Sequence, residues 1–88
     1  MYFVYILYCP ETDLSYVGQT DHLIYRFYRH RDGKSRWTRR MKKPLVIYWE
    51  MLDSRSEAIK REKYYKQGFG FRQRKDLVNR YIAEKYEC

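Results

Sequence analysis

One continuous apolar segment near the amino terminus constrains the fold more than any other feature of this sequence. Residues 2–8 read YFVYILY, a run of aromatic and β-branched side chains in which neither face of an extended chain is polar. A strand with one solvated face alternates between apolar and polar residues, whereas a strand covered on both faces does not. The run therefore predicts the buried central strand of a sheet.

The segments that follow predict a small α+β domain built on that strand. Residues 10–13 form a turn cluster, so residues 2–8 and 14–17 are expected to pair as an antiparallel hairpin that ends at Gly18. We expect one domain over residues 1–88, with a three-stranded antiparallel or mixed sheet flanked by helices in the order β-β-α-α-β-α-α. After the hairpin, the expected elements are a helix from Asp21 to about Arg31, a helical turn or two within 34–43, a strand at 45–52, a helix from Ser54 to about Gln67 and a last helix around 77–82.

Local signals mark the ends of these helices. Asp21 is expected to cap the first helix, whose apolar stripe comprises Leu23, Ile24, Phe27 and Tyr28. Ser54 and Glu57 form a capping box for the next helix, which Gly68 is expected to close. Residues 68–70 are then expected to form a loop.

The charge is strongly one-sided along the chain. The net charge is +8, yet no Lys or Arg precedes Arg26, and nine basic residues stand against one acid between Arg26 and Lys43. Such a field favours a polyanionic partner, either nucleic acid or an anionic membrane surface. A solvated basic surface that only promotes solubility is the alternative.

The cysteine and histidine content excludes the common zinc sites. Cys9 and Cys88 lie near opposite ends of the chain without a CxxC pair, and only two histidines are present. Cys9 is interpreted as a small hydrophobe at a strand end. Because the amino terminus lacks a basic leader and no apolar run approaches a membrane span, we expect a cytoplasmic protein.

Several polar residues occupy positions where apolar ones are expected. Glu62 falls near the middle of the helix face defined by Ala58, Ile59 and Tyr65. A carboxylate there needs a partner, so it either pairs with an Arg from another element or binds a metal ion. Glu50 could join it only if its strand face turns inward.

Two further polar residues lie on the first helix, and two tyrosines lie on the hairpin. Arg26 is at the border of the apolar stripe, and His30 follows four residues later on the same side. Taken alone, such residues most often extend to water or interact with the helix dipole. Tyr5 and Tyr16 either face each other or lie diagonally across the ladder, and a strand tyrosine is usually a core residue.

In their order along the chain, these residues resemble the GIY-YIG nucleases, in particular small standalone bacterial members similar to the N-terminal nuclease domain of the bacterial repair excinuclease. The resemblance covers about residues 2–78, with Val where the first tripeptide has Gly and where the second has Ile, and no DNA-targeting domain is recognised. The matching positions are Val4-Tyr5-Ile6, Tyr16-Val17-Gly18, Thr20, Arg26, His30, the segment 54–63 with Glu62, and Lys66.

The resemblance implies a metal-dependent endonuclease that hydrolyses DNA phosphodiester bonds with one ion, Mg²⁺ or Mn²⁺, held by Glu62. Tyr5 would be the general base or a base relay, Arg26 would stabilise the transition state, and Tyr16 and His30 would orient groups or move protons. The residues expected to grip the phosphate backbone are Arg29, Lys34, Arg36, Trp37, Arg39, Arg40, Lys42, Lys43 and Lys66, with Trp37 able to stack on a base.

Two alternatives without chemistry stay open. The chain could be a basic module that binds nucleic acid and uses Tyr5, Tyr16 and Glu62 structurally. It could also be an adaptor that docks on a larger repair assembly. A small nuclease domain could in addition need a protein partner for targeting, and repair, recombination and defence against foreign DNA are all compatible pathways.

Overall fold

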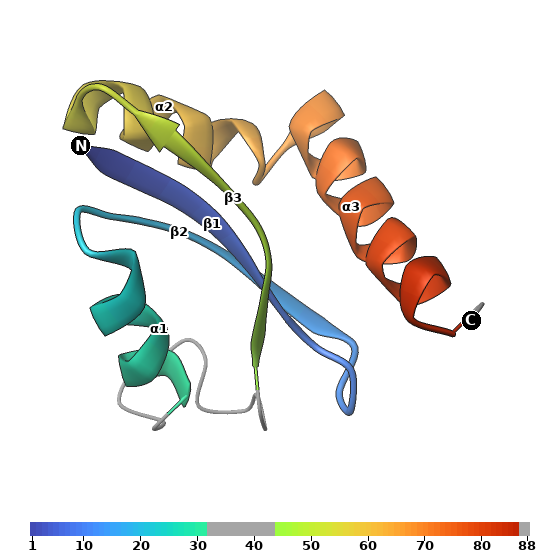
Figure 1. Ribbon diagram of the computed structural model, residues 1–88. Coiled ribbons are helices and arrows are strands. Elements are labelled where there is room, and N and C mark those ends of the chain that lie inside the picture. Colours follow the sequence, from blue (N-terminus) through green and yellow to red (C-terminus); the bar gives the residue numbers. More distant parts are fainter. Residues whose placement is uncertain (32–43, 87–88) are drawn as a thin grey trace.

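The computed structural model describes residues 1–31 and 44–86. Within these residues the elements follow the order β-β-α-β-α-α, which confirms the expected α+β class (Figure 1). The helical turns expected within residues 34–43 lie outside the described part. The elements are β1 (Tyr2–Cys9), β2 (Leu14–Thr20), α1 (Leu23–Arg31), β3 (Leu45–Leu52), α2 (Arg55–Tyr64) and α3 (Gly68–Tyr86).

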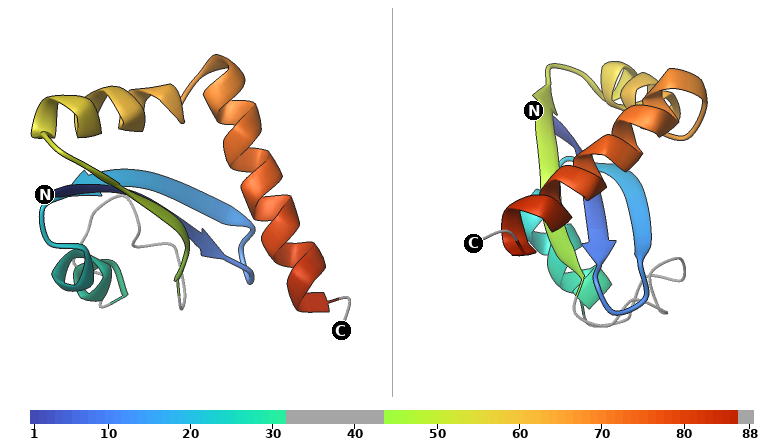
Figure 2. Two further views of the ribbon diagram at one scale, coloured as in Figure 1. Left: turned by 45° about the horizontal axis from the view of Figure 1, so that its top comes forward. Right: turned by 90° about the vertical axis from the view of Figure 1, so that its right-hand side faces the viewer.

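The apolar run forms the middle strand of the sheet, as predicted. The strand order is β2-β1-β3, and β1 pairs antiparallel with both neighbours. Helix α1 covers one face of this sheet, and α2 and α3 lie on the other (Figures 1 and 2). Because β1 is covered on both faces, alternate residues of the strand belong to two separate cores.

The two cores lie on opposite faces of β1. Val4 and Ile6 point into the first core, where they pack with Ala58 and Tyr65 of α2 and its C-cap. Tyr5, Leu7 and Cys9 form the second core beneath α1. Cys9 is thus a buried residue at the end of β1, as the sequence suggested. Because successive side chains point to opposite faces of a strand, β1 contributes to both cores.

Helix α1 begins differently from the prediction. Its first turn is capped by His22, whose Nδ1 accepts a hydrogen bond from the Tyr25 amide at 3.3 Å, instead of by Asp21. Asp21 lies 3.9 Å from the exposed Arg55 guanidinium. The apolar stripe is also narrower than predicted, because Ile24 is 68% exposed while Phe27 packs on the core.

The capping box of α2 is confirmed. Ser54 Oγ accepts a hydrogen bond from the Glu57 amide at 3.2 Å, and a Glu57 carboxylate oxygen accepts one from the Asp53 amide. The buried line of this helix runs through Ala58 and ends at Tyr65, and Ile59 is 37% exposed. The prediction that Ile59 defines the apolar face was therefore wrong, because that face is centred nearer to Tyr65.

The expected loop at residues 68–70 is the first turn of α3, and α2 ends at Tyr64 instead of near Gln67. Gly68 has a positive φ of 60°, which reverses the chain between the two helices. Gly70 permits the close approach, because a Cβ atom there would lie 1.7 Å from the Tyr64 carbonyl oxygen. The glycines that predicted a loop thus make a tight helix–helix corner.

None of the helices within residues 1–31 and 44–86 has the length and apolar character needed to cross a membrane.

Candidate functional site

The hairpin and α1 bring three of the predicted residues into contact. The Tyr5 hydroxyl lies 2.8 Å from Nε2 of His30, and both side chains are buried. The Tyr16 ring lies 4.9 Å from the His30 ring and 6.3 Å from the Tyr5 ring, centroid to centroid. Three positions up to 25 residues apart therefore form one aromatic and polar cluster.

The register of the hairpin explains how this cluster forms. Tyr5 pairs directly with Gly18, and Tyr16 pairs with Leu7, so the two tyrosines lie on a diagonal. A Cβ atom at Gly18 would lie 2.5 Å from the Tyr5 hydroxyl oxygen and 2.9 Å from the Tyr16 ring. The missing side chain therefore leaves room for both tyrosine rings to cross the backbone of β2.

The environment of Tyr5 keeps its phenol protonated at neutral pH. Burial raises the pKa of Tyr5 first of all, and the nearby Tyr16 and the charge of Glu62 raise it further. Arg26 has the opposite effect and lowers the pKa of Tyr5, through hydrogen bonding and through its positive charge. The charges of Arg26 and Glu62 thus both act on the Tyr5 hydroxyl, although they come from α1 and α2.

The environment of His30 keeps its imidazole neutral. Burial lowers the pKa of His30 to about 4, and the positive charges of Arg26 and Arg29 lower it too. The neutral Nε2 of His30 can accept a hydrogen bond, so we take the Tyr5 hydroxyl as the donor in this 2.8 Å contact. We assign the neutral imidazole proton to Nδ1 on this basis.

Glu62 lies on α2 and lines an open groove together with Tyr16. This groove has a volume of about 450 Å³, and Lys66, Ser15 and Arg74 also line it. The Glu62 side chain is 20% exposed, and its Oε1 accepts an ion-paired hydrogen bond from Lys66 Nζ at 3.0 Å. Tyr16 therefore connects the buried Tyr5–His30 pair with the groove that contains Glu62.

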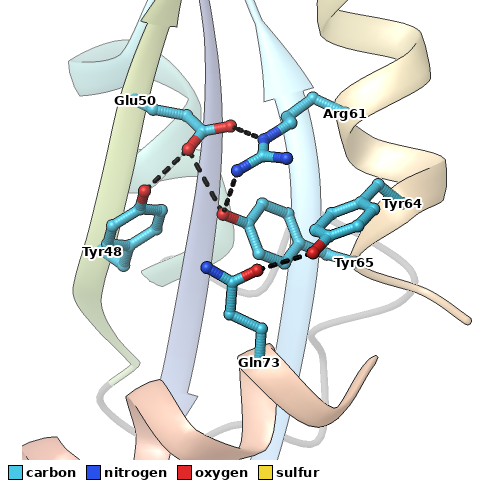
Figure 3. Close-up of polar contacts among 6 residues, drawn as sticks. All are labelled: Tyr48, Glu50, Arg61, Tyr64, Tyr65 and Gln73. Carbon is cyan, nitrogen blue, oxygen red and sulfur yellow. Dashed lines mark hydrogen bonds and ion pairs between the residues drawn. The ribbon is translucent and has the colours of Figure 1, made fainter. Parts of the chain in front are cut away.

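Glu50, the other carboxylate considered from the sequence, belongs to a different network (Figure 3). Its Oε2 accepts hydrogen bonds from the hydroxyls of Tyr48 at 2.7 Å and Tyr65 at 3.2 Å. Its Oε1 accepts a hydrogen bond from Nε of Arg61, which also donates to the Tyr65 hydroxyl. The paired arrangement that was one possible explanation for Glu62 is thus the one that Glu50 adopts.

The two carboxylates differ sharply in how well they are paired. Their side chains are almost equally shielded, at 18% exposure for Glu50 and 20% for Glu62. Glu50 has three donors, whereas within the described residues the carboxylate of Glu62 has one, the half-exposed ammonium of Lys66. A shielded carboxylate with spare acceptor capacity beside an open groove is suited to a hard divalent cation.

The single carboxylate of Glu62 fits one Mg²⁺ or Mn²⁺ ion whose remaining ligands are water and phosphate oxygens. No group of three or more His, Cys, Asp or Glu residues that could hold a metal occurs in the part of the chain that the structure describes. A one-carboxylate site is open to substrate, which agrees with the way Mg²⁺ is usually held beside phosphate groups.

The predicted phosphate-binding residues are only partly described. Arg29 lies near the cluster and stacks on the Tyr25 ring, with 6.0 Å between its Cζ and the ring centroid, and Lys66 lines the groove. The others lie outside the described residues; they are Lys34, Arg36, Trp37, Arg39, Arg40, Lys42 and Lys43.

Sequence reasoning missed Arg74. Its Nε donates to Ser15 Oγ at 3.0 Å and its Nη2 donates to the Ser15 carbonyl at 2.7 Å, which ties α3 to β2 at the rim of the groove. The signal was present, because Arg74 precedes Leu77 and Val78 by three and four residues on the apolar side of that helix. The criterion that singled out Glu62 also selects Arg74.

Comparisons with known proteins find a matching family model and several relatives. Residues 1–76 match the family model described as the GIY-YIG catalytic domain. The chain is 36% identical over 62 residues to a UPF0213 protein of Staphylococcus haemolyticus, and the aligned residues cover 69% of this chain and 74% of that relative. It is 35% identical over 68 residues to a UPF0213 protein of Limosilactobacillus reuteri, covering 74% and 70% respectively. No solved structure gives a significant match.

Proposed function

The chain belongs to the GIY-YIG family, and from this premise we propose that it is a divalent-metal-dependent endonuclease that hydrolyses DNA phosphodiester bonds. The observation that carries the proposal is the Tyr5–His30 hydrogen bond, placed behind Tyr16 at the groove that contains the underpaired Glu62. A catalytic domain of this family suggests nuclease activity, and nucleic acid is the corresponding substrate. Repair or recombination of DNA is the process we favour.

Tyr5 and His30 act as a proton relay in this proposal. The Tyr5 phenol is protonated at neutral pH and therefore cannot take a proton from water unless it gives up its own. The neutral His30 imidazole accepts that proton through the 2.8 Å hydrogen bond. Because the Tyr5 oxygen can take a proton from water only as its own proton moves to His30, the pair works as one base and neither residue suffices alone.

Arg26 stabilises negative charge in this proposal. Its positive charge lowers the pKa of both Tyr5 and His30, which supports a role for it beside negative charge that develops on the Tyr5 oxygen or on a phosphorane oxygen. An arginine keeps its charge in such a place and offers two parallel donors to a phosphate, which a lysine cannot do. Tyr16 orients the water and the phosphate at the groove.

Glu62 would hold the metal ion, with Lys66 left to contact a phosphate. When bound, the ion supplies Lewis acidity and stabilises the leaving oxygen. The 3.0 Å ion pair with Lys66 orients the carboxylate in the meantime. A protein partner that delivers the domain to its target is part of the same proposal, because an open groove of this kind discriminates little between nucleic-acid sequences.

Plasmid nicking tests this function. We would incubate the protein with supercoiled plasmid and Mg²⁺ or Mn²⁺, with EDTA as the metal-free arm, and compare the Glu62→Gln and Arg26→Ala variants. We expect nicking that needs metal and that falls by about a hundredfold or more in either variant, since each removes an electrostatic contribution to the transition state. DNA binding measured in EDTA should persist in both.

Glu57→Gln is the matched control, because Glu57 lies on the same helix but is exposed, and among the described residues its carboxylate accepts a hydrogen bond only from the Asp53 amide. This variant should nick like the wild type. Nicking that survives Glu62→Gln would show that the site is misplaced. A wild type that binds DNA with metal present but never nicks it would favour the non-catalytic binding module.

A further inference from the structure

Two grooves meet at a single arginine. The first contains Tyr16, Glu62 and Lys66, as described above. The second, of about 350 Å³, lies between the β1–β2 hairpin and α3. Ser15 and Arg74 line both grooves. A nucleic-acid strand that left the first groove past Arg74 would therefore enter the second. Figure 2 shows α3 alongside this hairpin.

Arg74 is a fixed cation at the junction. Within the described residues, both of its hydrogen bonds go to Ser15 and no carboxylate pairs with it. Burial lowers the pKa of Arg74 from its usual value, but a guanidinium stays charged at neutral pH. A cation held in place by neutral acceptors is preorganised for an anion such as a phosphate.

The second groove combines an accessible aromatic ring with positive charge. Phe71 is 39% exposed, and Lys75 Nζ lies 5.0 Å and Arg74 Cζ 5.8 Å from the centroid of its ring. The one acid among the described lining residues is Asp13, which accepts a hydrogen bond from the Tyr8 hydroxyl at 2.8 Å. Two cations against one acid leave the lining positive beside the ring.

The size of this groove limits what can enter it. At about 350 Å³ it lies at the lower end of the usual range for small-molecule sites, about 300–1,000 Å³. One nucleotide fits such a volume, and a base within a continuous duplex is already stacked on its neighbours. An aromatic platform flanked by cations is also the arrangement with which proteins hold unpaired bases.

We propose that the groove between the β1–β2 hairpin and α3 binds one unpaired nucleotide next to the cleaved phosphodiester. Phe71 stacks on the base, and Arg74 and Lys75 contact its flanking phosphates. The preferred substrates are then strands with an unpaired base beside the cut, single-stranded or branched, and continuous duplex is a poorer one. This inference rests on the proposed function for the neighbouring groove and names its substrate class.

The test separates base stacking from phosphate contact. We would measure the binding of a fluorescent twelve-residue oligothymidylate and of an abasic strand of equal length and charge, in EDTA, by anisotropy. Stacking contributes about 1–3 kcal/mol per base, so the wild type should prefer the thymidylate by about tenfold or more. Phe71→Leu should remove most of that preference, and Phe71→Tyr, which keeps a ring, should retain it.

Two further variants complete the experiment. Phe69→Leu is the matched control, since Phe69 is 79% exposed on the same helix but does not line the groove, and it should bind like the wild type. Lys75→Gln should leave the base preference intact and lower the slope of log K against log salt concentration by about 0.7 for a single strand.

Some outcomes would overturn the inference. One is a base preference that is unchanged in Phe71→Leu; another is an equal loss of affinity for both strands in that variant. A third is a wild type that binds duplex as tightly as the thymidylate. Because binding is measured without metal, these results are independent of the nicking assay, so the failure of one proposal is distinguishable from the failure of the other.

Discussion

At the residue scale, two carboxylates with nearly the same shielding have different surroundings. Glu50 is saturated by Arg61, Tyr48 and Tyr65, and it holds β3 against α2. Glu62 has a single lysine partner within the described residues, beside an open groove. Burial of a charge is therefore a weak guide to function, and the number of donors around it discriminates better.

The buried His30 makes stability depend on pH. Its pKa is about 4 in the folded protein and about 6.5 in an unfolded chain, so the unfolded state binds more protons between these values. Stability from this residue is complete above pH 6.5 and is lost as the pH falls toward 4. We expect a loss of about 2 kcal/mol between pH 7 and pH 5.

Urea unfolding of the wild type and of His30→Gln at both pH values measures this effect. Glutamine can still hydrogen bond to the Tyr5 hydroxyl but does not titrate, so its pH dependence should be smaller by about the stated 2 kcal/mol. Equal pH dependence in the two proteins would mean that His30 is not held neutral by the fold.

At the element scale, the corner between α2 and α3 depends on two glycines for different reasons. Gly68 needs its positive φ but has no atom within 4 Å of an added Cβ, whereas Gly70 lacks the space for one. The corner aims α3 back toward the hairpin, where Arg74 reaches Ser15. The position of the second groove is thus set by a backbone contact far from it.

Alanine substitutions separate the two roles. Gly68→Ala should cost about 1–2 kcal/mol, the penalty of a left-handed conformation for a residue with a Cβ. Gly70→Ala should cost about 3 kcal/mol or more, because its Cβ collides with backbone that cannot move without opening the corner. Chemical denaturation of both variants measures the difference; a smaller loss in Gly70→Ala than in Gly68→Ala would contradict this account.

At the scale of the whole molecule, one strand supplies both cores. Val4 and Ile6 belong to the core under α2, and Tyr5 and Leu7 belong to the core under α1. If β1 unfolds, the core beneath each helical layer therefore loses its central residues. Tyr5 and His30, the residues of the proposed relay, come from a different layer than Glu62, and the same strand holds the two layers together.

We therefore expect the chain to unfold as a single domain. Far-UV circular dichroism, which follows the helices, and tryptophan fluorescence, with Trp49 on β3, should give coincident transitions in urea. Separate transitions would mean that one layer persists without the other and that the two cores are independent.

The sequence by itself determined the features that depend on residues close together along the chain. The unbroken apolar run predicted a central strand, and Ser54 with Glu57 predicted the start of α2, because strand periodicity and helix caps are local. The resemblance to the GIY-YIG nucleases, and not spacing alone, selected Tyr5, Tyr16 and His30 as candidate site residues. Whether they perform the proposed chemistry stays a prediction.

Only the tertiary structure decided which distant residues meet. The diagonal of Tyr5 and Tyr16 over Gly18 depends on the strand register, and the direction of α3 depends on the corner at Gly70. The Arg74–Ser15 contact joins positions 59 residues apart. Periodicity specifies which face of an element is buried but not what lies opposite, because that follows from how the elements cross when both cores are filled.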